Sequence, residues 1–268
     1  MNHMTWKDLQ SRCYAPYSGR NDVCMVQGAS GTLYPGVRVE NISFPLTVDA
    51  VQAALFSCLS EGDTPRKLIM PASSNQEQDG ESSGSAGKIP ASDPADHSAA
   101  HVCSAAELRY WCDQFKLACN QHEQPEGGHP SRTFRTSENQ TGIQRLKELT
   151  TRCVIPYSFF PVTALLVSDA GIFSGVNIEV SDWQKGLCAE RVAMAKARAA
   201  GAASFREIHV YAPQSDYVSP CGACRQILIE HMADGSMYMH HNDSEITRLS
   251  IADLLPYQFK AGQLGQQS

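Results

Sequence analysis

The chain has 268 residues, of which 42% are hydrophobic, and a formal net charge of −6 at pH 7. This length allows one large or two ordinary domains, whereas the negative charge and the lack of a Lys/Arg-rich block argue against a nucleic-acid-binding protein. No run of about 18 apolar residues occurs and the N-terminus lacks the apolar stretch of a signal peptide, so we expect a cytoplasmic protein with a small or neutral substrate.

An internal repeat divides the chain into two related halves. The motif RCYAPYS at 12–18 returns as RCVIPYS at 152–158, 140 residues later, and GVRVE at 36–40 returns as GVNIE at 175–179, 139 residues later. A drift of only one residue between two landmarks indicates a duplicated domain. We expect residues 1–71 and 102–122 to form the first copy and residues 138–268 to form the second.

The segment between the two copies has a different composition. Residues 72–101 contain no aromatic and few large apolar side chains, so they cannot offset the entropy lost on ordering, and we expect a disordered insertion. The next stretch, 104–119, is compatible with a helix. Residues 123–137, rich in Gly, Pro and His at their start, are expected to be a linker.

In the second copy, elements follow one another at short spacing. A helix is expected to end near Arg152, and the strand 162–168 should turn at Asp-Ala-Gly into a second strand that begins at 172. A helix from Leu187 with Gly201 at its C-terminal end, a strand at 207–213 and a helix at 221–232 should follow. A hairpin followed by alternating helices and strands is typical of an α/β sandwich.

Three cysteines of the second copy suggest a metal site. Cys221 and Cys224 form a C-x-x-C pair at a helix start, where backbone N–H groups favour thiolates. Alone, this pair is compatible with a redox dithiol or half of a structural zinc site. Together with Cys188 it gives three thiolates and one open position, which is the composition of a catalytic zinc site.

Two groups beside these cysteines have the chemistry that such a zinc site needs. The cation would separate the cysteine thiolates from the carboxylate of Glu190, and its bound water would face that carboxylate. Three thiolates weaken Zn²⁺ as a Lewis acid, so we expect Arg191 and Arg225 to donate hydrogen bonds to the sulfurs. The alternative for each arginine is a surface salt bridge.

At these residues the sequence resembles the cytidine deaminase family, whose class carries [H/C]-A-E followed by P-C-x-x-C. The string SPCGACRQ at 219–226 matches the family without change, and PYSFFPV, GVNIE and LLPYQF also resemble family motifs. The resemblance covers 140–260 and, more faintly, 5–70. It implies a duplicated three-layer α/β/α sandwich with a mixed five-stranded sheet in each half.

The resemblance also implies roles for individual residues. Cys188, Cys221 and Cys224 would bind one Zn²⁺ per chain, and Glu190 would move a proton from zinc-bound water to N3 of the pyrimidine and then to the leaving ammonia. A further set matches the substrate-binding positions of the family, with the ribose hydroxyls held by Asn177 and Glu179 and the base packed against Phe160. The chain departs from the family at VSDW (180–183) and at Thr163, and these changes bear on the shape of the pocket and so on the preferred substrate.

The first copy lacks the catalytic groups. At the same offset Asp49 stands in the place of Cys188, Val51 in the place of Glu190 and Arg38 in the place of Asn177. Cys103 resembles a remnant of the second cysteine motif, with Ala106 at the place of its second cysteine. We therefore expect no zinc in this copy. By analogy with two-domain relatives, it would contribute packing, and its Phe44 is a candidate pocket residue, within a homodimer of pseudo-tetrameric shape.

The leading hypothesis is hydrolytic deamination of cytidine and deoxycytidine in pyrimidine salvage. A related enzyme would deaminate another aminopyrimidine nucleoside, such as blasticidin S. A non-catalytic zinc-binding scaffold and a thiol-redox protein with a Cys221–Cys224 disulfide are the alternatives outside this class. The sparse Lys and Arg residues argue against an editor of polynucleotides.

Overall fold

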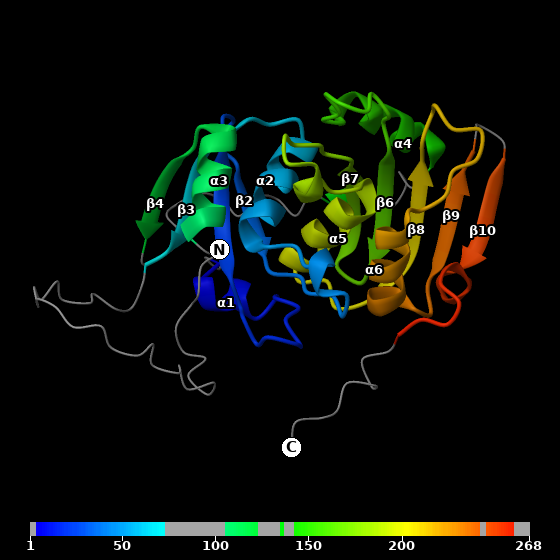
Figure 1. The fold of residues 1–268 in the computed structure, drawn as a ribbon, viewed down its shortest axis with the longest axis horizontal. Coiled ribbons are helices and arrows are strands. Elements are labelled where there is room, and N and C mark those ends of the chain that lie inside the picture. The colour runs from blue at the N-terminus through cyan, green and yellow to red at the C-terminus, as the bar shows by residue number, and fades with distance from the viewer. Residues whose placement is uncertain (1–3, 73–104, 123–134, 137–141, 242–244, 260–268) are drawn as a thin grey trace, which may run out of the picture.

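The computed structural model describes residues 4–72, 105–122, 135–136, 142–241 and 245–259. Within them the chain forms two mixed β-sheets with helices packed on both, side by side along the long axis of the molecule (Figure 1). This confirms the predicted α/β class. No helix in these ranges is long and apolar enough to span a membrane. The predicted insertion at 72–101 lies outside the described residues except for its first residue.

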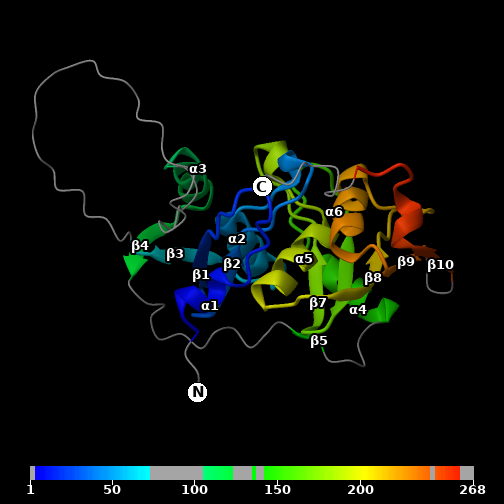
Figure 2. The ribbon, with the colours of Figure 1, turned by 90° about the horizontal axis from the view of Figure 1, so that it is seen from below.

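The N-terminal half contains a four-stranded sheet in the order β2-β1-β3-β4. Strand β1 is antiparallel to β2 and β3, and β3 is parallel to β4. In Figure 2, helix α1 lies on one face of this sheet and α2 and α3 lie on the other. The elements are α1 (Trp6–Gln10), β1 (Val23–Gly28), β2 (Leu33–Val37), the 3₁₀ turn η1 (Phe44–Leu46), α2 (Ala50–Ser60), β3 (Pro65–Pro71), α3 (Ala105–Phe115) and β4 (Ala118–His122).

The C-terminal half contains a six-stranded sheet in the order β10-β9-β8-β6-β7-β5. All neighbours are antiparallel except β8 and β9. The elements are β5 (Arg135–Thr136), α4 (Ile143–Leu149), η3 (Thr150–Arg152), β6 (Thr163–Ser168), β7 (Gly171–Val176), η4 (Trp183–Lys185), α5 (Ala189–Ala199), β8 (Phe205–Tyr211), α6 (Gly222–Met232), β9 (Ser236–His240), β10 (Ile246–Ser250) and η5 (Ile251–Leu254).

Among the described residues, neither sheet has the five strands that were predicted. The first sheet has four strands among the described residues, because its equivalent of β10 is absent from them. The second sheet gains β5, whose two residues pair with β7 through Arg135–Phe173 and Thr136–Ile172. Residues 135–136 belong to the predicted linker 123–137, so part of that segment is bound to the sheet edge.

The central strand β6 separates two layers of helix in the C-terminal half. Leu165 and Val167 belong to the apolar cluster that includes Leu146 of α4. Ala164 and Leu166 belong to the cluster formed with α5 and α6. Because successive side chains of a strand point to opposite faces, α4 covers one face of the sheet and α5 and α6 cover the other, as Figure 2 shows.

The two halves repeat the same backbone pairings at the offset found in the sequence. In each half, one residue after the second strand forms two isolated β-bridges. One bridge joins it to a residue of the motif that contains Pro-Tyr-Ser, and the other joins it to the residue just before the N-cap of the following helix. The equivalent sets are Tyr14, Val39 and Val48 in the first half and Val154, Ile178 and Leu187 in the second. The duplication inferred from short motifs therefore extends to the strand and loop architecture.

A glycine in each half allows a helix start to lie directly on a strand. A Cβ atom at Gly36 would lie 2.0 Å from the carbonyl oxygen of Ala50, and one at Gly175 would lie 2.1 Å from that of Ala189. Both carbonyl groups belong to the first residue of a helix, α2 or α5. The glycines thus fix the positions of Asp49 and Cys188, which directly precede these helices.

Candidate zinc and catalytic site

The N-termini of α5 and α6 bring the three predicted metal ligands together. Cys188 is the N-cap residue of α5, Cys221 is the N-cap residue of α6, and Cys224 lies in the first turn of α6. The N–H groups of a first helical turn have no partner within the helix and favour negative charge. Both helices therefore stabilise thiolates at this point.

The spacing of the sulfur atoms fits a zinc ion. The Sγ atoms of Cys188, Cys221 and Cys224 lie within 4.8 Å of one another, and those of Cys188 and Cys221 are 3.6 Å apart. Tetrahedral Zn–S bonds of about 2.3 Å place sulfurs about 3.8 Å apart. Hydrogen bonds from Cys188 and Cys224 lower the pKa of Cys221, so the cluster readily carries a thiolate. These are the zinc-binding cysteines of the chain, and three ligands leave one position open.

Glu190 is placed beside the cysteines, and its own side chain is buried. It lies in the first turn of α5 and is 4% exposed. Burial raises the pKa of its carboxyl group to about 7; its own backbone N–H opposes this rise and the charge of Cys221 adds to it. Its Oε2 atom has no hydrogen-bond partner among the described residues. Such a carboxyl group can accept and release a proton near neutral pH.

Asn177 and Glu179 shape the loop that precedes β6. Glu179 Oε2 accepts hydrogen bonds from the backbone N–H groups of Tyr157 and Ser158, at 3.0 and 3.1 Å. Burial raises the pKa of Glu179, but these two bonds and a hydrogen bond from the Ser158 hydroxyl have the larger combined effect. The pKa of Glu179 therefore lies below its usual value. Asn177 donates from Nδ2 to the carbonyl of Phe160 at 2.8 Å. Its Oδ1 accepts a hydrogen bond from the backbone N–H of Val162, just before β6, at 2.9 Å.

Phe160 is held in place by this loop. Its side chain is partly buried against the apolar cluster of the C-terminal half. Its neighbour Phe159 has a φ of 56° and is 69% exposed, so the backbone turns sharply at this point and directs the two rings differently. Phe160 therefore lies on a loop that is fixed by hydrogen bonds to Asn177 and Glu179, which come from the segment after β7.

Comparison with known proteins agrees with this site. The family model "Cytidine and deoxycytidylate deaminase zinc-binding region" matches residues 136–240. The cytidine deaminase of Sporosarcina psychrophila is 41% identical over 125 residues, which are 46% of this chain and 91% of that protein. The chain belongs to the cytidine deaminase family. This confirms the predicted enzyme class, a hydrolase, and the predicted zinc cofactor.

Other members of the cytidine deaminase family match the same part of the chain. The cytidine deaminase of Halalkalibacterium halodurans is 38% identical over 109 residues, covering 40% of this chain and 83% of that protein. The crystal structure of cytidine deaminase from Burkholderia pseudomallei has 35% sequence identity and a TM-score of 0.41, and covers 44% of this chain and 95% of that one.

The two predicted sulfur-directed arginines make different contacts. Arg191 is 8% exposed and donates from NH2 to the carbonyl of Leu46 in the N-terminal half, at 2.9 Å. Burial lowers its pKa, and the nearby cysteines oppose that effect. Arg225 donates to the carbonyl of Pro220 and the hydroxyl of Ser219, at 3.0 and 2.9 Å. Arg225 thus braces the turn before α6, and the donation of either arginine to a sulfur stays a prediction.

The contact of Arg191 has a counterpart that sequence reasoning missed. Gln52, which stands 139 residues before Arg191, donates from Nε2 to the carbonyl of Lys185 at 2.6 Å. Leu46 ends η1 and Lys185 ends η4, so each half holds the equivalent turn of the other. The offset of the repeat would have paired these positions, but only the folded chain shows that their contacts cross between halves.

The N-terminal half keeps the framework of the site without its chemistry. Glu40 accepts from the N–H groups of Tyr17 and Ser18, just as Glu179 does from its own loop. Asp49 caps α2 by accepting from the N–H of Gln52 at 2.8 Å. The Cys103 remnant lies outside the described residues. Phe44, the candidate pocket residue, is 84% exposed.

Proposed function

We propose that the C-terminal half catalyses hydrolytic deamination of cytidine and deoxycytidine to uridine and deoxyuridine, with release of ammonia. The observation that carries this proposal is the buried Glu190 beside three sulfur atoms spaced for zinc. The relatives named above, which are cytidine deaminases, support the choice of substrate.

The reaction needs a water molecule, a proton carrier and a closed site. Zinc held by the three cysteines supplies, when bound, a water that is activated at neutral pH. Glu190 would accept the first proton of that water and donate it to N3 of the pyrimidine, where it stays, and would then carry the second proton of the same water to the departing amino group. The C4–N bond breaks and a C4–O bond forms, so cytidine and water give uridine and ammonia.

We further propose that Asn177 and Glu179 bind the ribose hydroxyls and that Phe160 packs against the base. Hydrogen bonds link the two segments that carry them, since Asn177 holds the carbonyl of Phe160 and Glu179 holds the N–H groups of Tyr157 and Ser158. A change in either polar residue would therefore move the base as well as the sugar. The site also excludes solvent around Glu190, which strengthens each charge in it.

The organisation of the chain is part of this proposal. Residues 138–268 would form the catalytic domain with one zinc, and residues 1–71 with 102–122 would form a catalytically inactive copy of the same cytidine-deaminase-like sandwich. Two chains would assemble into a homodimer with a pseudo-tetrameric arrangement of domains in the cytoplasm. Val51, fully buried at the place of Glu190, cannot carry a proton.

The test is conversion of cytidine to uridine, followed by absorbance, with the zinc-containing protein and a Glu190→Gln variant. We expect Glu190→Gln to retain one zinc per chain and to lose at least about 10²-fold in rate, because a positioned proton carrier contributes on the order of 10²–10⁴-fold. Equal rates for the two proteins would refute the role of Glu190. Zinc-loaded protein that leaves cytidine and deoxycytidine unchanged would refute the substrate assignment.

A further inference from the structure

A cavity of about 590 Å³ lies in the N-terminal half, at the place that corresponds to the catalytic site. Its wall includes Asp49 and Gln52 from the start of α2, together with Glu40. Pockets for small organic ligands have volumes of about 300–1,000 Å³. The volume is therefore that of a ligand site, although the groups that would react are missing.

The C-terminal half forms part of the wall of this cavity. Asp182, Gln184 and Lys185, from η4 and the residue before it, line it. The bond from Gln52 to the carbonyl of Lys185 fixes this turn against α2. Arg191 also reaches the cavity from the first turn of α5. The cavity is thus a composite of both halves, held closed by a direct contact between them.

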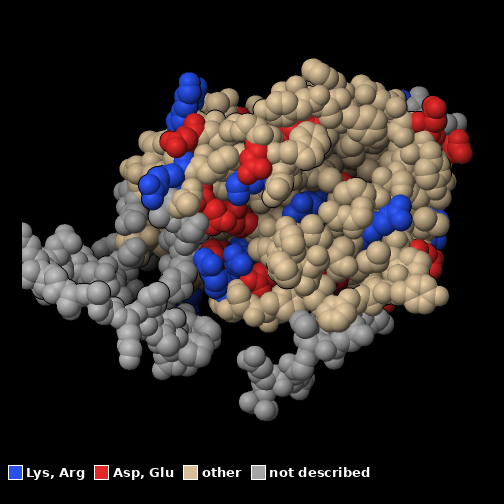
Figure 3. Space-filling view, in the orientation of Figure 1, with Lys and Arg blue, Asp and Glu red and all other residues tan. Residues whose placement is uncertain are grey.

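The charges of the wall are balanced. Four cationic side chains face four carboxylates, and these are Arg20, Arg38, Lys185 and Arg191 against Glu40, Asp49, Glu107 and Asp182. Several are already paired, since Arg38 Nε donates to Glu40 at 2.8 Å. Figure 3 likewise shows acidic and basic side chains intermixed on the side of α2 and α3. A balanced wall disfavours a polyanion and suits an uncharged ligand that both donates and accepts hydrogen bonds.

One buried residue of the wall, Asn41, points to a ligand that carries a hydrogen-bond acceptor. Asn41 is 2% exposed; its Oδ1 accepts from the N–H of Ser43, whereas its Nδ2 has no partner among the described residues. A buried donor without a partner costs about 1–3 kcal/mol, so an acceptor atom from a ligand would relieve this cost. Trp111 also lines the cavity, but its side chain is fully buried and its ring packs against Phe56, Tyr110 and Phe115.

We propose that this cavity is a second, non-catalytic binding site for an uncharged pyrimidine nucleoside. The proposal rests on the proposed function, because the nucleoside would be the substrate or product of the other half. Val51 replaces the proton carrier and Asp49 replaces a thiolate ligand, so a nucleoside bound here leaves unchanged. A chain would then hold two nucleosides and convert only one.

The test counts uridine molecules bound to the zinc-containing full chain by equilibrium dialysis, since uridine is not consumed. We expect two per chain in the natural protein. Asn41→Asp removes the free donor and adds a charge, and Gln184→Trp fills the cavity from its exposed rim; each should leave one uridine per chain. Gln114→Trp, the same change on an exposed residue of α3 that does not line the cavity, should leave two.

The outcomes separate this proposal from the function of the catalytic half. One uridine per chain in the natural protein, lost when Cys221 is changed to Ser, would overturn the second site while the deaminase stands. A different result would support the second site and refute the deaminase. In that case uridine binding would be lost in the Asn41 and Gln184 variants but kept in the Cys221 variant, and the natural protein would not convert cytidine. Urea midpoints equal to that of the natural protein would show that the variants are folded.

Discussion

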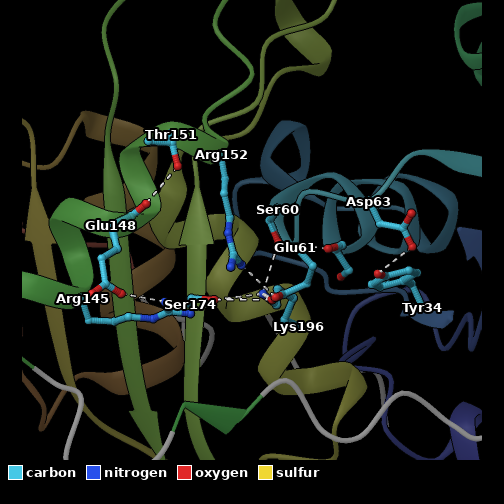
Figure 4. A network of polar contacts seen from close by, with 11 residues as sticks. Tyr34, Ser60, Glu61, Asp63, Arg145, Glu148, Thr151, Arg152, Ser174 and Lys196 are labelled. Atoms are coloured by element: carbon cyan, nitrogen blue, oxygen red, sulfur yellow. Dashed lines mark hydrogen bonds and ion pairs between the residues drawn. The ribbon is translucent and has the colours of Figure 1, made fainter. Parts of the chain in front are cut away.

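The buried ion pair between the two halves gives a quantitative prediction of stability. Glu61 follows α2, and its Oε1 accepts from Lys196 Nζ of α5, whose side chain is only 1% exposed (Figure 4). Lys196 also contacts the hydroxyl groups of Ser60 and Ser174, both at 3.2 Å. Burial lowers the pKa of Lys196, and Glu61 opposes that effect. Glu61 thus supplies a carboxylate that compensates the charge of this buried ammonium group.

Replacing Glu61 with Gln should leave Lys196 charged and buried, which costs about 3–5 kcal/mol in the free energy of unfolding. The amide oxygen still accepts one hydrogen bond, so we expect the lower end of this range. The double variant Glu61→Gln/Lys196→Met removes both charges. It leaves only Arg152, whose side chain is 31% exposed and can reach water. The double variant should therefore lose less stability than Glu61→Gln alone.

Urea unfolding followed by far-UV circular dichroism measures these differences through the transition midpoint. Glu148→Gln is the matched control, because Glu148 pairs with Arg145 at 3.0 Å with half of its side chain exposed, 51%. Exposed pairs contribute about 0–1 kcal/mol. If Glu61→Gln cost no more than Glu148→Gln, or if the double variant were the least stable, the Glu61–Lys196 pair would not stabilise the contact between the halves.

Three further predictions concern packing, pH and the metal. Gly175→Ala should lower the free energy of unfolding by about 3 kcal/mol, because the Cβ of the alanine would overlap the α5 backbone. Gly142→Ala is the control, since a Cβ there meets no atom within 4 Å and should leave stability unchanged. Midpoints of urea unfolding measure both. Burial and the charge of Arg198 lower the pKa of His231 to about 3. The unfolded chain then binds the extra proton, and stability falls as pH drops from about 6.5 by up to about 1.4 kcal/mol per unit, a loss that His231→Gln should reduce. Cys224→Ser should lower the zinc content measured by atomic absorption well below one per chain; full zinc retention would contradict the assignment of this ligand.

The sequence predicted the elements that have a strong local signal. The turn at Asp-Ala-Gly forms, with Gly171 at a φ of 126°. The helix predicted from Leu187 begins at Ala189 and ends at Ala199, before Gly201 at a φ of 91°. The spacing of apolar residues and the local composition indicate where these helices start, and Cys188 and Cys221 are found at their N-termini. Strand β5 was missed because two residues show no periodicity, and they join the sheet only through the neighbouring β7.

Contacts between the halves could not be predicted, because they depend on how two similar units face each other. Because Arg191 and Arg225 both lie beside cysteine motifs, the sequence suggested that both donate hydrogen bonds to the sulfurs. In the structure Arg191 donates to the carbonyl of Leu46 in the other half, and Arg225 donates to the carbonyl of Pro220 in its own half. The long arginine side chain reaches several acceptors from one position, so the neighbouring sequence alone does not choose among them.

The reciprocal bonds of Arg191 and Gln52 explain why a half without catalytic groups remains useful. Arg191 directly follows Glu190, and its bond to Leu46 joins the first turn of α5 to the N-terminal half. Gln52 occupies the equivalent position of the N-terminal half, and its neutral amide makes the matching bond to the carbonyl of Lys185 in the C-terminal half. In the C-terminal half the equivalent residue is the cation Arg191, on which the charges of the three cysteines act. The contact between the halves is therefore kept in both copies, with a neutral amide in one and a guanidinium group in the other.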